Sequence, residues 1–63
     1  MNERDVWDAA GVLIEEHGEH AAIVAAQRAD EFLEQGDMDR RRLWIRITQA
    51  VASMIDIPQG AAN

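Results

Sequence analysis

Apolar residues recur every three or four positions along most of this chain, and two glycines, Gly18 and Gly36, divide the pattern into three segments of similar length. Such a period is typical of amphipathic helices. Glycine just past the last periodic residue is a common helix end, because it adopts the left-handed conformation without a Cβ clash. We therefore predict helices over about residues 3–17, 20–35 and 38–55.

Helix start signals accompany these ends. Asn2 is suited to cap the first helix, and Asp5 follows three positions later, as in a capping box. Asp37, directly after Gly36, is suited to cap the third helix. Connections of about two to three residues favour antiparallel neighbours. We predict an all-α fold in which residues 1–55 form an antiparallel, up-down-up three-helix bundle.

The predicted core combines one apolar face from each helix. The residues assigned to these faces are Val6, Trp7, Ala10, Leu13, Ile14 and His17 in the first helix, Ala22, Ala25, Ala26, Ala29, Phe32 and Leu33 in the second, and Leu43, Trp44, Ile47, Ala50, Val51, Met54 and Ile55 in the third. Four alanines in the second helix predict a close approach by a neighbouring helix. Residues 56–63 contain the only proline and end in small residues, so we expect a flexible, irregular tail there.

Length and composition limit the classes of protein to which the chain can belong. At 63 residues it has room for one small domain, and without cysteine it can form neither a disulfide nor a thiolate zinc site. No segment approaches the roughly 20 apolar residues of a membrane span. The N-terminal segment is acidic and lacks a signal-peptide pattern. We therefore expect a cytoplasmic location and no membrane partner.

Charge is distributed unevenly along the chain. The net charge is −6, from 12 acidic residues and six arginines. Residues 1–37 hold ten of the acidic residues and two arginines, whereas residues 38–63 hold two acidic residues and four arginines. The predicted third helix is therefore basic against an acidic remainder, which indicates either complementarity within the bundle or a recognition surface.

Several short motifs occur in a characteristic order along residues 7–47. They are Trp7 with Ala10, His17-Gly18 followed by Ala21 and Ala22, Arg28-Ala29-Asp30, Gly36-Asp37, and Trp44 with Ile47. In this order and spacing the chain resembles a family of short, acidic, all-helical bacterial proteins, mainly alphaproteobacterial, catalogued as a domain of unknown function. The resemblance implies a cytoplasmic bacterial protein without an assigned activity, and it transfers no catalytic residue.

The sequence gives little support for a catalytic site or a metal site. Glu16, His17, Glu19 and His20 could together bind a divalent cation. However, the two histidines are three positions apart across the helix-breaking Gly18, and we interpret His17 as a residue packed at the end of the first helix. No nucleophile elbow, phosphate loop or paired acid–base site is present in the sequence. We expect a non-enzymatic protein with no cofactor, no metal and no small-molecule substrate.

The remaining apolar positions suggest where a partner would bind. Met38, Ile45 and Ala52 share the reverse side of the third helix at seven-residue spacing, and Ile23 and Val24 lie off the apolar face of the second. Together with two arginines, the candidate interaction surface comprises Met38, Arg41, Arg42, Ile45, Ala52, Ile23 and Val24. We predict a protein–protein interaction or self-association module, with a homodimer as one form.

The alternative is a nucleic-acid-binding or regulatory protein that uses the third helix. Arg40, Arg41, Arg42 and Arg46 surround Trp44 there, as in a recognition helix that contacts phosphates. The net charge of −6 disfavours this alternative, because nucleic-acid binding depends on neutralising phosphates.

Overall fold

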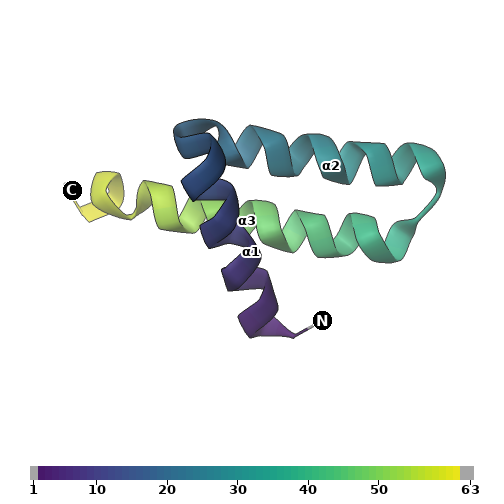
Figure 1. Ribbon diagram of the computed structural model, residues 1–63, viewed down its shortest axis with the longest axis horizontal. Helices are drawn as coiled ribbons and strands as arrows, with labels where there is room; N and C mark the ends of the chain where they lie inside the picture. Colours follow the sequence, from purple (N-terminus) through teal and green to yellow (C-terminus); the bar gives the residue numbers. More distant parts are fainter. Residues whose placement is uncertain (1, 62–63) are drawn as a thin grey trace.

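The computed structural model describes the backbone of residues 2–61 and the side chains of residues 2–55. Helix α1 runs from Glu3 to His17, the single 3-10 turn η1 from Gly18 to His20, α2 from Ala21 to Gln35 and α3 from Met38 to Ala61 (Figure 1). No strand occurs within residues 2–61. The predicted all-α class is confirmed.

The three helices pack on one another in an arrangement that differs from a simple bundle. Figure 1 shows α2 and α3 side by side as an antiparallel hairpin, while α1 crosses α3 at a steep angle. α2 and α3 make the most extensive contact between elements, and α1 packs mainly on α3. The up-down-up arrangement is therefore not confirmed, because α1 crosses the hairpin instead of running alongside it.

The predicted helix ends agree with the local geometry. Asn2 forms a capping box: its side-chain oxygen accepts a 3.0 Å bond from the Asp5 amide, and its own amide donates to the Asp5 carboxylate. Gly36 has φ 77° and ψ 14°, and it ends α2 in a Schellman motif, in which the Gly36 amide donates to the Leu33 carbonyl and the next amide to Phe32. The Asp37 carboxylate accepts a 3.1 Å bond from the Arg40 amide and caps the start of α3, so both ends of the α2–α3 connection are capped.

The α1–α2 corner is tighter than a loop. Gly18 has φ 58° and ψ −130°, a combination that strongly favours glycine, and its amide donates to the carbonyl of Ile14. The chain then completes one 3-10 turn before α2 begins at Ala21, one residue later than predicted. This turn redirects the chain so that α2 leaves at an angle to α1.

Helix α3 extends beyond its predicted end at Ile55. It continues to Ala61, so the irregular conformation expected for residues 56–63 is wrong for residues 56–61, and residues 62–63 lie outside the described part of the chain. Pro58 removes one amide donor but fixes φ near −65°, which is itself a helical value. A single proline is therefore insufficient to end this helix.

A small, alanine-rich core lies where α1 crosses the hairpin. Its buried residues are Val6, Ala10, Ala21, Ala25, Ile47, Ala50 and Val51. Ile47 and Val51 are the largest fully buried side chains among those described. Of the four alanines predicted to face inward on α2, Ala25 and Ala29 are buried, Ala22 is half-buried and Ala26 is exposed. The most extensive contact of α2 is with α3.

Five residues predicted to face inward are instead exposed. Trp7, Leu33 and Met54 are 43%, 44% and 39% exposed, and Ala26 and His17 are also exposed. The prediction assumed neighbouring helices along the whole length of each apolar face. Because α1 meets α3 at a crossing, side chains at the ends of these faces have no third helix to cover them.

Substituting alanine at Gly36 and at Gly11 should have opposite effects on stability. At Gly36 the added Cβ meets nothing within 4 Å, so the cost is the left-handed conformation alone, about 1–2 kcal/mol of the free energy of unfolding. Gly11 lies inside α1 without a positive φ, and a Cβ there also meets nothing within 4 Å. Gly11→Ala should therefore stabilise the chain by about 0.5–1 kcal/mol.

Urea unfolding of both variants, followed by far-ultraviolet circular dichroism, measures the two shifts. A loss of stability in Gly11→Ala would contradict the helical geometry described for α1.

Removing one methylene from Ile47 should destabilise the fold. Ile47 is 1% exposed, so Ile47→Val should lower the free energy of unfolding by about 0.5–1.5 kcal/mol. Ile23, 56% exposed on α2, is the matched control, and Ile23→Val should change stability by less than about 0.5 kcal/mol. Thermal unfolding of the two variants makes the comparison, and equal effects would contradict the placement of the core.

Candidate interaction surfaces

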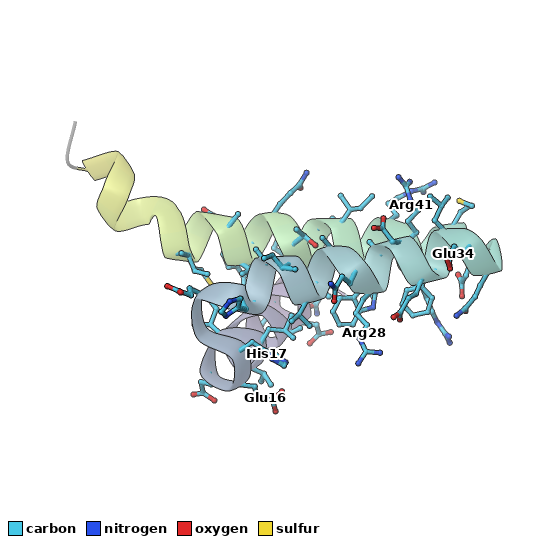
Figure 2. All side chains as sticks on the ribbon, turned by 90° about the horizontal axis from the view of Figure 1, so that it is seen from above. Glu16, His17, Arg28, Glu34 and Arg41 are labelled. Carbon is cyan, nitrogen blue, oxygen red and sulfur yellow. The ribbon has the colours of Figure 1, made fainter. Side chains whose placement is uncertain are left out.

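The seven residues predicted for an interaction surface do not form one patch. Met38 and Ile23 are 45% and 56% exposed, Arg42 is exposed, and the remaining four, Arg41, Ile45, Ala52 and Val24, are half-buried. Met38, Arg41, Ile45 and Ala52 follow helical spacing along one side of α3. Figure 2 places Arg41 on the side of the hairpin away from Glu16 and His17 of α1. These four residues therefore belong to the side of the hairpin that α1 leaves uncovered.

Val24 is separated from this side by the geometry of α2. Figure 2 shows Arg28 pointing to the α1 side of the hairpin. Val24 lies one turn before Arg28 and shares that side, since residues four apart are neighbours on a helix surface. Ile23 is 56% exposed and lies three positions before Ala26, on the side of α2 away from Arg28. Val24 therefore lies apart from the α3 group, whereas Ile23 shares its side of the hairpin.

Other residues of α2 do share the uncovered side. A helix rotates by about 100° per residue, so positions two before and two after Arg28 point to the opposite side of α2. Those positions hold Ala26 and Asp30, and Leu33 lies one turn beyond Asp30. All three are exposed. We call the combined surface the open face; it comprises Ile23, Ala26, Asp30 and Leu33 of α2 with Met38, Arg41, Ile45 and Ala52 of α3.

A second surface lies at the crossing of α1 and α3. A shallow depression of about 270 Å³ is lined by Glu3, Val6, Trp7, Arg46, Gln49, Ala50 and Ser53. A neighbouring depression of about 310 Å³ is lined by Asp39, Arg40, Arg42, Leu43 and Arg46. Arg46 lines both, so the two depressions are neighbours along residues 39–53 of α3, and together they make up this second surface. Arg42 belongs to this surface and not to the open face.

The prediction that Trp7 faces the core is wrong. Its side chain is 43% exposed and lines the depression of about 270 Å³ where α1 crosses α3. The available signal was its position next to Val6. Adjacent helical residues point about 100° apart, so a narrow contact can bury only one of them. Val6 is the one buried.

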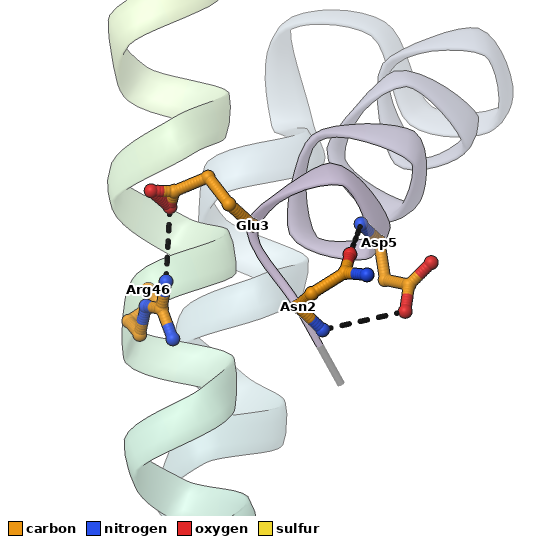
Figure 3. Close-up of polar contacts among 4 residues, drawn as sticks. All are labelled: Asn2, Glu3, Asp5 and Arg46. Atoms are coloured by element: carbon orange, nitrogen blue, oxygen red, sulfur yellow. Dashed lines mark hydrogen bonds and ion pairs between the residues drawn. The ribbon is translucent and has the colours of Figure 1, made fainter.

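Two of the arginines on α3 already form ion pairs within the chain. Arg46 donates a 2.9 Å hydrogen bond to the Glu3 carboxylate, which links α3 to the start of α1 (Figure 3). Arg40 lies 3.6 Å from the Asp37 carboxylate and over the Phe32 ring at 5.9 Å. Among residues 2–55, Arg41 and Arg42 form no ion pair. The charges left for a partner are therefore on Arg41 and Arg42.

His17, at the corner between α1 and α2, is more exposed than the periodicity predicts. The His17 side chain is 38% exposed and its Nε2 atom lies 3.9 Å from the Glu16 carboxylate. The predicted packing of His17 on the apolar face is therefore wrong, since the chain turns away at Gly18. Within the described residues, no three His, Asp or Glu side chains gather closely enough to hold a metal ion. In the same part of the chain the buried residues are all apolar.

None of the described helices combines the length and the apolar composition needed to cross a bilayer.

Comparisons with known proteins do not identify a family. No protein-family model matches the chain, and searches of curated proteins and of solved structures also gave no match. The resemblance to a domain of unknown function therefore stays a prediction.

The Glu3–Arg46 contact should contribute little to stability. Both side chains are largely exposed, at 71% and 47%, and exposed pairs contribute about 0.2–1 kcal/mol. A double-mutant cycle with Glu3→Gln and Arg46→Gln should give a coupling energy in this range, measured by urea unfolding. The coupling should fall at high salt because the pair is screened. A control cycle with Glu15→Gln and Arg46→Gln should show no coupling.

Proposed function

We propose that this protein is a non-enzymatic interaction module that binds another protein, or a second copy of itself, through the open face. In this proposal the α2–α3 hairpin is the scaffold, and the open face on it recognises the partner. A cytoplasmic location is part of this proposal.

The main support for the proposal is that several large apolar side chains are exposed instead of lying in the core. Leu33 and Met38 are 44% and 45% exposed on the open face, whereas Ile47 and Val51 are the only large side chains described as fully buried. A domain of this size has a small margin of stability, because it buries a low fraction of its surface. Covering clustered apolar side chains with a partner adds burial that the chain alone does not supply.

The shape of the described surface also fits binding of a macromolecule better than catalysis. Both depressions are shallow, and their lining residues project from helix surfaces. Among residues 2–55 no polar side chain is buried, so the depressions have no desolvated acid, base or nucleophile beneath them. A protein surface, by contrast, needs only apolar anchors with a polar rim.

The nucleic-acid alternative has weaker support. Arg40 and Arg46 are paired with Asp37 and Glu3, and Trp44 is half-buried against the core, so it is not free to stack on bases. Arg41 and Arg42 project from different sides of α3. Phosphate binding by all four arginines would therefore require breaking two contacts, on a chain of net charge −6.

Site-specific photo-crosslinking in the source cell tests the proposed module. A photo-reactive amino acid replacing Leu33 or Met38 should give a discrete protein adduct, because both side chains lie on the open face. Val12, 51% exposed on α1, is the control position and should give none. Adducts of equal yield at all three positions, or none at any, would contradict the proposal.

A further inference from the structure

We infer that the occupant of the open face is a second copy of this chain, held in a two-fold symmetric dimer with Asp30 of each copy opposite Arg41 of the other. This inference rests on the proposed function and specifies its partner.

The charges of the open face are self-complementary. Asp30 on α2 and Arg41 on α3 have opposite signs and lie on the same side of the hairpin. Among residues 2–55 neither forms an ion pair within the chain. In a two-fold interface the same patch meets itself, so a contact from Asp30 to Arg41 occurs twice. A single patch bearing both signs therefore suits a copy of itself.

The apolar residues of the open face suit the same partner. Ala26, Leu33, Met38 and Ile45 lie beside the two charges, and the part of the hairpin nearest the α2–α3 turn has no third helix over it. Two hairpins placed face to face would form a four-helix arrangement around these side chains. The small side chain of Ala26 would allow the helices to approach closely.

The size of the face is compatible with a stable dimer. A typical specific interface buries about 800 Å² on each partner. The chain exposes 4564 Å² in all, so such an interface would cover roughly a sixth of its surface. Helix α2 has 15 residues and is thus about 22 Å long, and a hairpin two helices wide gives a face of the required order.

Electrostatic repulsion between two copies of the chain determines the ionic strength at which dimerisation should be measured. Each chain carries a net charge of −6, which opposes association over long distances. At physiological ionic strength charges more than about 8 Å apart are largely screened, whereas charges in direct contact are screened less. The acidic residues of α1 and η1 are Glu3, Asp5, Asp8, Glu15, Glu16 and Glu19. On α2, Glu34 lies one turn after Asp30 and adds a negative charge beside the open face.

Sedimentation equilibrium of the full chain with a charge swap tests the inference. The unmodified chain should dimerise. Asp30→Arg and Arg41→Asp should each weaken the dimer by about a hundredfold, because each places two like-charged pairs in the interface. The double variant Asp30→Arg/Arg41→Asp should restore dimerisation, a result that unfolding of the single variants cannot produce.

Arg28→Asp is the matched control. It makes the same substitution as Arg41→Asp and changes the net charge equally, but it lies on the α1 side of the hairpin. It should leave the dimer unchanged. Far-ultraviolet circular dichroism checks that every variant keeps its helix content.

Three results would overturn the inference: a monomer at about 1 mM chain, single reversals that leave the dimer intact, or a double variant that does not regain it. A monomer whose open face still crosslinks specifically to a different protein would overturn the second copy as partner and leave the interaction module standing. A monomer without specific crosslinks would overturn both.

Discussion

The close contact between α2 and α3 is the constraint on which the rest of this structure depends. Alanines at positions 21, 25 and 29 line the inner side of α2, and all three are buried. Because their side chains are short, the two helices can approach until backbone and Cβ atoms nearly fill the space between them. Among the described residues, Ile47 and Val51 of α3 are the largest fully buried side chains, and Leu43, Trp44 and Ile55 pack partly buried against the core.

The position of α1 follows from this contact. The hairpin has too small an interior to bury much apolar surface alone, so α1 contributes Val6 and Ala10 where it crosses α3. The 3-10 turn after Gly18 directs the chain into this crossing. A crossing covers a short length of each helix, whereas a parallel packing would cover the whole length. The side chains beyond the crossing consequently remain exposed.

The two candidate surfaces are products of the same geometry. At one, the crossing leaves Trp7 and Arg46 around a shallow depression, and Glu3 satisfies the arginine. At the other, the hairpin exposes Leu33 and Met38 beside unpaired charges. The second surface carries the proposed function because it combines apolar area with charges that the described part of the chain does not pair.

Local signals in the sequence determined the helices and their ends. Asn2, Asp37 and the two glycines were sufficient for this, because capping and positive φ depend on residues within a few positions of one another. The third helix was the exception, since the backbone continues past Pro58 to Ala61. The surface group of Met38, Arg41, Ile45 and Ala52 on α3 could also be read from spacing, because residues on one helix keep their relative directions.

Tertiary structure decided which apolar side chains are buried and which residues of different helices share a face. Periodicity gives the direction of a side chain around its own helix axis, but it contains nothing on the angle at which another helix crosses that axis. Trp7 and Leu33 are therefore exposed although their positions in the pattern resemble those of buried residues. For the same reason, Val24 and Arg42 were predicted to belong to the interaction surface but do not lie on the open face. Asp30 and Leu33 lie on the open face although they were not predicted to.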